Sequence, residues 1–208
     1  MMKDTKQKII FTAIKIFASK GLHGTRMEEI AKHAKVNKAM VYYYFASKDK
    51  LFREAVLQIL MKIFEGILVE LAEYEHQNTN EIMKVEHLVR KHFRVFSENP
   101  DYCKLLLEAV ATESDVFQDA MDSIKKNTGL FLPDLFNRFF SEGVKKNVFR
   151  KINPQQVLIS VMGMNLIYFI ERPIAKIWFQ KQKSNESKFI KEREESIIDL
   201  LLYGIVKR

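Results

Sequence analysis

The sequence predicts an all-α protein with an N-terminal three-helix domain that contains a helix-turn-helix, and a larger C-terminal helical bundle. Two observations favour this fold class. Apolar residues recur along most of the chain at the three- and four-residue spacing of amphipathic helices. The 208 residues include only seven Gly and four Pro, and the first Pro is Pro100. We place the two domains at residues 1–50 and 51–208.

The first helix is expected to begin after Asp4, because an Asp at the N-cap with Gln7 three positions later matches a capping box. Apolar residues from Ile10 to Phe17 follow at helical spacing. Gly21 is a natural end for this helix, since glycine adopts the left-handed conformation without a Cβ clash.

The second helix is expected to open at Thr25, which forms a second capping-box pattern with Glu28. Residues 35–37 then read as a tight turn. Asn37 closes this turn and is suited to cap the N-terminus of the next helix. Two short helices joined by three residues are the layout of a helix-turn-helix.

The third helix should present one face to the core and the other to solvent. Val41 and Phe45 are four residues apart, so we expect both to point inward. Ser47 should cap the long helix that follows. The outward face of the third helix is then formed by Lys38, Ala39, Tyr42 and Tyr43.

The basic charge of the chain is concentrated in this first domain. Residues 1–50 contain eleven Lys and Arg against four Asp and Glu, a net charge of +7, whereas residues 51–208 contain 23 against 22. A phosphate backbone would attract such a domain. The alternative is a plain three-helix bundle with a solvated basic face. The capping patterns, the three consecutive tyrosines at residues 42–44 and the charge together favour DNA binding.

Residues 51–208 read as further helices and short breaks. Gly129 and Pro133 are points of interruption in one long predicted helix, and Asn153-Pro154 should start a helix that is apolar nearly all round through Phe169. We expect that helix to be buried on several sides and to kink at Pro173. Polar loops are expected at residues 78–80 and 184–187. The remaining expected helices cover residues 48–75, 81–97, 101–112, 115–146 and a final segment to 206.

Several classes of function are disfavoured by what the sequence lacks. The single cysteine, Cys103, beside an apolar run, reads as a core residue and fits a reducing cytoplasm. No signal peptide and no membrane span are expected. The histidines lack metal-ligand spacing, so we expect no metal and no cofactor. No nucleophile, base and phosphate loop can be assembled, so we do not expect an enzyme.

Residues 9–55 resemble the DNA-binding domain of the TetR family of bacterial transcriptional repressors. The most diagnostic segment is Tyr42-Tyr43-Tyr44-Phe45 followed by Ser47-Lys48 and Leu51-Phe52. Lys35 and Arg26 depart from the usual family pattern. The resemblance implies a cytoplasmic homodimer that binds a near-palindromic double-stranded DNA operator. DNA contacts are expected from Thr25, Arg26, Lys38, Ala39, Tyr42, Tyr43, Tyr44 and Lys48.

The same resemblance implies that the second domain binds a small, largely apolar effector and that its last two helices form the dimer interface. Asn165 and Tyr168 interrupt an apolar segment, and Phe93, Phe96 and Phe139 could line the same cavity. The alternative is that Asn165 only satisfies a core or interface hydrogen bond. The interface is expected to involve Ile197, Ile198, Leu201, Leu202 and Ile205.

Three functions remain open from the sequence. The first is a repressor that a small-molecule ligand releases from DNA. The second is a DNA-binding protein of the same fold without an effector, for example an architectural or division-linked factor. The third is an enzyme with an acquired basic domain, which the missing catalytic residues disfavour.

Overall fold

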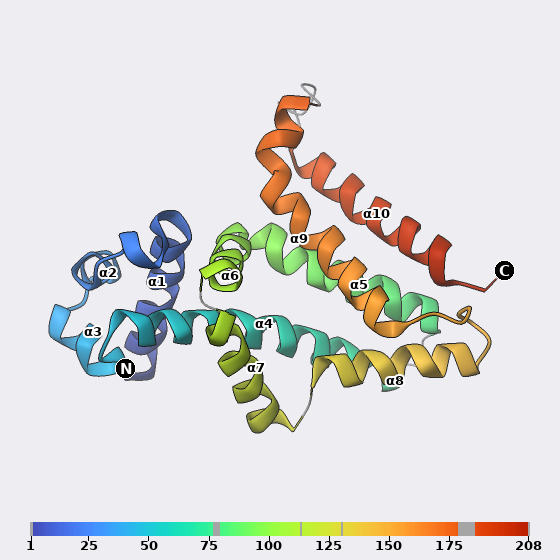
Figure 1. Ribbon diagram of the computed structural model, residues 1–208, viewed down its shortest axis with the longest axis horizontal. Coiled ribbons are helices and arrows are strands. Elements are labelled where there is room, and N and C mark those ends of the chain that lie inside the picture. The colour runs from blue at the N-terminus through green and yellow to red at the C-terminus, as the bar shows by residue number, and fades with distance from the viewer. Residues whose placement is uncertain (1, 77–79, 113, 130, 179–185, 208) are drawn as a thin grey trace. The chain divides into compact units, whose positions relative to one another are not determined.

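The computed structural model describes all residues except 1, 77–79, 113, 130, 179–185 and 208, and the described residues form ten helices (Figure 1). The only β pairing among them is an isolated bridge between Phe149 and Val206. The all-α fold class is therefore confirmed. The helices are α1 (Met2–Gly24), α2 (Met27–Ala34), α3 (Lys38–Phe45), α4 (Lys48–His76), α5 (Glu81–Glu98), α6 (Pro100–Thr112), α7 (Ser114–Thr128), α8 (Leu132–Lys145), α9 (Pro154–Trp178) and α10 (Glu186–Ile205).

The chain forms two compact units. Unit 1 contains residues 1–62 and 99–129, and unit 2 contains residues 63–98 and 130–208. The sequence placed the division after residue 50. In the structure α6 packs against α1, and α7 packs against α6, so both helices belong to the unit that holds the helix-turn-helix.

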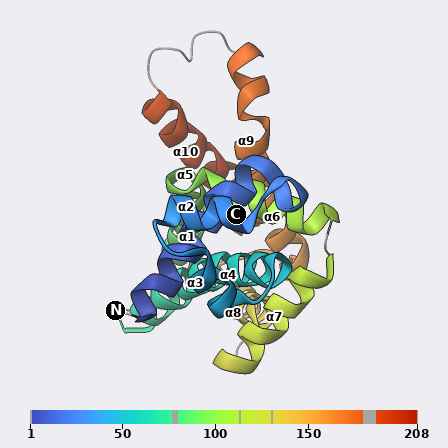
Figure 2. The same ribbon diagram turned by 90° about the vertical axis from the view of Figure 1, so that its left-hand side faces the viewer.

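The core of unit 1 is built from the inward faces of α1 to α4, as the helical spacing predicted. The rings of Phe17 on α1 and Phe52 on α4 meet edge to face with centroids 5.2 Å apart. Both side chains are fully buried. Figure 2 turns α1, α2 and α3 toward the viewer. Other fully buried members of this core are Ile9, Ile10, Ile14, Ile30, Leu51 and Ile59.

Most of the predicted helix ends are confirmed. The side chain of Asn37 accepts a hydrogen bond from the backbone N–H of Ala39 at the start of α3. Ser47 Oγ accepts from the N–H of Lys50 in the first turn of α4. Asn153 Oδ1 accepts from the N–H of Gln155 at the start of α9. Short polar side chains therefore cap the N-termini of these three helices, as predicted from the sequence.

Other predicted boundaries need correction. Helix α1 begins at Met2, so Asp4 lies in its first turn, where its charge favours the helix dipole, and is not the N-cap. Gly21 does leave helical geometry, with φ 72° and ψ 172°, but helical hydrogen bonding resumes up to Gly24. The expected interruption near Gly129 and Pro133 is confirmed, because α7 ends at Thr128 and α8 begins at Leu132. Residues 78, 79, 184 and 185 of the predicted loops lie outside the described part of the chain.

The described residues of unit 2 share an apolar core built from α5, α8, α9 and α10. Phe140 and Phe149 pack with ring centroids 5.5 Å apart and are almost fully buried. A Cβ added to Gly143 would lie 2.2 Å from the Phe149 ring, so this approach requires glycine. Ion pairs at the rim connect α5 to α10: Arg90 with Glu195 at 2.6 Å, and Arg94 with Glu194 at 3.0 Å.

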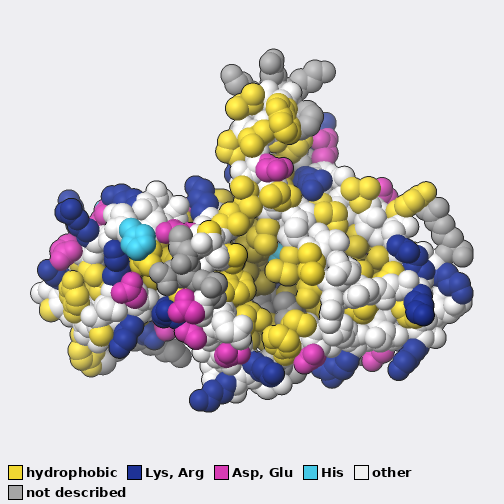
Figure 3. All heavy atoms as spheres, viewed as in Figure 1, with side chains coloured by type: hydrophobic (Ala, Val, Ile, Leu, Met, Phe, Trp, Pro, Cys, Tyr) yellow, Lys and Arg dark blue, Asp and Glu magenta, His cyan; other side chains and the backbone are white. Residues whose placement is uncertain are grey.

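Helix α9 differs most from its prediction. It continues through Pro173, but it is not buried on several sides. Its length and composition from Pro154 to Ala175 are those of a helix that could cross a membrane, and only 17% of the most apolar window is buried in the protomer. Hydrophobic side chains gather on the surface over this helix (Figure 3).

Candidate nucleic-acid interface and the sites around it

Helix α3 is held in place by a strained turn and by two buried anchors. Lys35, the C-cap of α2, has a left-handed backbone with φ 53° and ψ 45°. Val41 and Phe45 are buried, as predicted. The exposed residues of α3 include Lys38, Ala39, Tyr42 and Tyr43, as predicted, and also Met40; Tyr43 keeps 74% of its surface in solvent.

Lys38 is positioned by two neighbours. Its Nζ lies 2.5 Å from Glu28 Oε1 on α2 and 5.6 Å from the centre of the Tyr42 ring. The hydrogen bond and charge of Glu28 raise the pKa of Lys38, and the Lys38 contact lowers the pKa of Glu28. Both groups are therefore charged at neutral pH, and the ammonium lies at the exposed start of α3.

Thr25 does not present its side chain to a ligand. It is 2% exposed, and its hydroxyl donates to the carbonyl of Gly21 at 2.7 Å. The N-cap of α2 is Arg26, and no side chain caps that helix. The predicted capping box of Thr25 with Glu28 is therefore wrong, because the Thr25 hydroxyl bonds backwards to the end of α1. Arg26 is exposed beside this turn.

The last two predicted DNA-contact residues lie at the edge of the exposed face of α3. Tyr44 is half-buried, and its ring packs edge to face on Tyr43 with centroids 5.3 Å apart. Lys48 begins α4, and its ammonium donates to the carbonyl of His23 at 3.4 Å. Lys48 therefore lies within reach of the same surface as α2 and α3.

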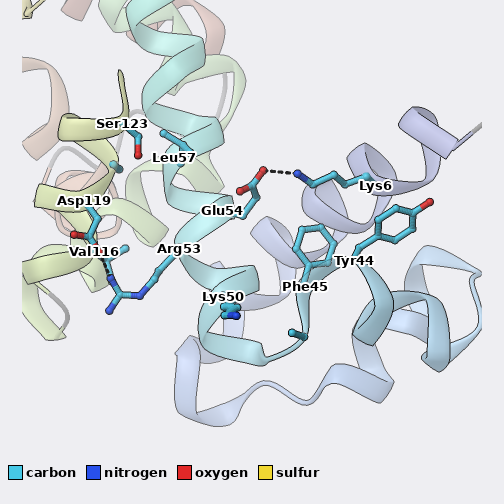
Figure 4. Close-up of a pocket in the computed structure, with 12 residues that line it drawn as sticks. Lys6, Tyr44, Phe45, Lys50, Arg53, Glu54, Leu57, Val116, Asp119 and Ser123 are labelled. Atoms are coloured by element: carbon cyan, nitrogen blue, oxygen red, sulfur yellow. Dashed lines mark hydrogen bonds and ion pairs between the residues drawn. The ribbon is translucent and has the colours of Figure 1, made fainter. Parts of the chain in front are cut away.

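A groove of about 370 Å³ in unit 1 borders the C-terminal end of α3 (Figure 4). Ion pairs cross it. Lys6 on α1 lies 2.9 Å from Glu54 on α4, and Arg53 on α4 contacts Asp119 at 2.5 Å and Asp115 at 2.6 Å on α7. These side chains are partly solvent-exposed, so each pair contributes modestly to stability. They connect the first turns of α4 to α1 and α7.

Helix α6 supplies a second connection inside unit 1. The carboxylate of Glu108 accepts from the N–H of Leu22 at 2.5 Å, at the point where Gly21 leaves the helical conformation. A Cβ at Gly21 would lie 2.7 Å from the same carboxylate oxygen. Glycine at this position therefore serves both the positive φ and the approach of Glu108.

Unit 2 contains a buried polar pair at one of the predicted effector residues. Asn165 on α9 is fully buried, and its Nδ2 lies 2.7 Å from His92 Nδ1 on α5 and 3.5 Å from the carbonyl of Val89. Burial lowers the pKa of His92 to about 4, so the ring is neutral and Nδ1 accepts from the amide. Asn165 Oδ1 has no partner among the described residues.

Aromatic side chains surround this pair, and four of the five predicted effector residues come together. Phe93 stacks on Tyr168 with centroids 6.1 Å apart, and Phe96 packs edge to face on His92 at 5.2 Å. Phe139 lies apart from them in a ring cluster with Phe140 and Phe149. Judged from the sequence, His92 is an isolated histidine. Its partner Asn165 is 73 residues away, so no local pattern indicates the contact.

The residues predicted for the dimer interface lie mostly inside the protomer. Leu202 is partly buried, and the other four are 6% exposed or less and belong to the core of unit 2. Side chains enclosed by their own chain cannot form an intersubunit surface. The exposed apolar residues of α10 are Leu200 and Tyr203, which point away from the face that Ile198, Leu201 and Ile205 share.

The described residues contain no group of three or more His, Cys, Asp or Glu that could hold a metal ion. Cys103 is buried, and burial raises the pKa of its thiol to about 11. It is therefore a protonated core residue, as the sequence indicated.

Comparison with known proteins identifies the family. Residues 9–55 match the model for bacterial regulatory proteins of the tetR family, and residues 79–208 match the tetracyclin repressor-like C-terminal domain. The chain belongs to the TetR family. It is therefore a DNA-binding transcriptional regulator and not an enzyme.

Individual relatives are similar over different lengths. The transcriptional repressor NicS of Pseudomonas putida is 48% identical over 48 residues, which are 23% of each chain. The regulator RutR of Escherichia coli is 24% identical over 78% of this chain and 73% of its own. A putative fatty acid metabolism regulator of Clostridium perfringens has a TM-score of 0.71 at 21% identity, covering 97% of this chain and all of its own.

Proposed function

We propose that this TetR-family regulator is a cytoplasmic homodimeric repressor of a near-palindromic DNA operator, and that a small effector bound in unit 2 releases it. The observation that carries the proposal is the exposed face of α3, where Lys38, Ala39, Tyr42 and Tyr43 stand on a capped helix anchored by buried residues. The N-terminal part of such a helix meets base edges in the major groove.

The proposed contacts divide by chemistry. Lys38 can donate to guanine acceptors, and Ala39 can touch a thymine methyl group. Tyr43 extends beside them, with Arg26 as a further base contact from the start of α2. Tyr42, Tyr44 and Lys48 are assigned to phosphates, since hydroxyl and ammonium groups on the flanks of a recognition helix fix its register. The net charge of +7 on residues 1–50 supports this face as the DNA side.

The proposed dimer surface is the exposed apolar stripe of α9 together with α10. The exposed apolar residues of α9 recur at helical spacing on the face that contains Gly163. The space where a Cβ of Gly163 would lie is open, with no atom within 4 Å, so a second helix could approach closely there. A contiguous apolar surface of this kind marks an interface. The stripe consists of Ile159, Ile167, Ile170, Ile174 and Ile177 on α9, with Leu200 and Tyr203 on α10.

The proposed effector site is the aromatic region around Asn165. Its unpartnered Oδ1 is a buried acceptor, and leaving such a group unpaired has a cost that a ligand donor would remove. Phe93, Phe96 and Tyr168 supply apolar walls, so the expected effector is largely apolar and carries one hydrogen-bond donor. Phe139 is kept as a more distant contributor. Helix α4, whose residues are divided between the two units, is the proposed route to DNA release.

A release experiment tests the proposal. Operator sequences are first selected from a random DNA pool, and the complex is then followed by fluorescence anisotropy while fractions of a metabolite extract are added. We expect one fraction to release the wild-type protein. Asn165→Leu should keep DNA binding and lose the response, whereas Asn127→Leu, at an exposed position on α7, should respond normally.

Two outcomes would contradict parts of this account. If no fraction releases the wild type, the protein fits the alternative of a DNA-binding protein without an effector. If the Asn165→Leu variant responds like the wild type, the effector binds elsewhere. The repressor assignment is supported by the name of NicS, which is a repressor.

A further inference from the structure

Glu28 makes only a small structural contribution, as an acidic residue near the positive end of the α2 dipole. It lies in the first turn of α2, but that helix has no side-chain cap, and Glu28 remains 53% exposed at its side chain. Its one ion-pair partner among the described residues is Lys38, at 2.5 Å. Exposed ion pairs of this kind contribute little to folding stability. The pair therefore needs a reason beyond stability.

The position of the pair makes a carboxylate unexpected. Lys38 is the first residue of α3, beside the exposed tyrosines that form the proposed DNA face. A negative charge on that face is repelled by phosphates. A carboxylate is favoured there when it accepts a hydrogen bond from a base, and cytosine N4 is the donor that Glu reads in the major groove.

We propose that Glu28 and Lys38 together read one G·C base pair in each half-site. Guanine presents the acceptors O6 and N7 to a lysine, and its partner cytosine presents the N4 donor to a carboxylate. O6 and N4 are hydrogen-bonded to each other, so they lie side by side, as the ammonium and carboxylate do here. In an A·T pair, adenine presents only N7 as an acceptor to Lys38, and thymine adds a methyl group.

Tyr42 supports the proposed role of Lys38 in recognising the G·C pair. The ring of Tyr42 lies 5.6 Å from the ammonium and holds it by a cation–π contact from one side, while Glu28 holds it from α2. The donor is therefore oriented before DNA arrives, which reduces the entropy lost on binding. This inference rests on the proposed role of Lys38 in base reading, and adds Glu28 and the identity of the base pair.

The matched variants are Glu28→Gln, which keeps the size of the side chain, Lys38→Met, and the control Glu29→Gln. Glu29 is the adjacent carboxylate and pairs with Lys20 on α1 instead. Each variant is put through selection from a random DNA pool, and the preference at every position is then measured by competition binding with single base-pair changes.

We expect the wild type to select G·C at one position per half-site. Glu28→Gln should reduce the preference for that pair roughly 5- to 150-fold and shift it toward adenine, which Gln reads well. Lys38→Met should relax the same position, and Glu29→Gln should leave the motif unchanged. Removing the 4-amino group from that cytosine should weaken binding of the wild type more than binding of the Glu28→Gln variant.

Three results would overturn the inference. The first is that the Glu28→Gln variant selects the same motif as the wild type. The second is that Lys38→Met and Glu28→Gln relax the preference at different positions. The third is that the wild type selects A·T at the position that Glu28→Gln changes. Failure of the wild type to select any motif would contradict the proposed base reading itself, so the two failures are distinguishable.

Discussion

At the residue scale, the Asn165–His92 pair shows how one buried contact constrains both chemistry and stability. The amide donates to a neutral ring, and the ring stays neutral because burial makes its charged form costly. Protonation would place a donor opposite a donor. The pair therefore makes the stability of unit 2 depend on pH.

The first prediction concerns that dependence. The pKa of His92 is about 4 in the folded protein and about 6.5 in an unfolded chain. The unfolded state therefore binds more protons between these values, and the free energy of unfolding falls as pH drops from 6.5 toward 4. The total loss is roughly 3 kcal/mol, at about 1.4 kcal/mol per pH unit.

Urea denaturation between pH 7 and pH 4.5 measures this effect. His92→Gln can still accept from the Asn165 amide but does not titrate, so its stability should vary less with pH than that of the wild type. Equal pH dependence in the two proteins would show that His92 is not the group responsible.

Residue-level patterns predicted contacts well where the partner is close in sequence. Asn37, Ser47 and Asn153 cap the helices that follow them, because a short polar side chain reaches the first turn directly. Thr25 and Glu28 have the same spacing as a capping box but bond elsewhere, to Gly21 and to Lys38. Local spacing cannot distinguish these cases, since the competing partners come from other helices.

At the element scale, α9 and α10 show what helical periodicity leaves open. The apolar character of both helices was evident from the sequence, and both lie in unit 2. Periodicity did not separate the apolar face that enters the protomer core from the one that remains exposed. Ile197 and Leu201 enter the core, whereas Leu200 and Tyr203 on the same helix do not.

The second prediction uses this distinction between adjacent residues. Leu200 is 58% exposed and Leu201 is 6% exposed. Leu200→Glu should leave the protomer folded but dissociate the dimer, because the carboxylate would be buried only at the proposed interface. Leu201→Glu should lower the stability of the protomer itself by several kcal/mol, since it buries an unpaired charge in the core.

Light scattering and circular dichroism read out the two effects separately. A Leu200→Glu protein that remains dimeric at micromolar concentration would exclude this face of α10 from the interface. A Leu201→Glu protein that melts like the wild type would contradict the burial of Leu201.

At the scale of the whole molecule, the two units have different proposed partners. Residues 1–50, which include the helix-turn-helix, carry a net charge of +7, and unit 2 carries the exposed apolar stripe and the buried polar pair. The fold class and the existence of a DNA-binding domain followed from the sequence. The grouping of α6 and α7 with the N-terminal helices did not, because it depends on contacts such as Leu22 with Glu108, 86 residues apart.

Two copies of this chain are proposed to bind one near-palindromic operator, each through its α3. One helix-turn-helix offers few base contacts, and a two-fold pair doubles them. The most direct test is the mass of the complex formed between the wild-type protein and its best selected duplex, measured by light scattering. We expect two chains on each near-palindromic duplex, and a single chain on an asymmetric site would contradict operator binding by a dimer.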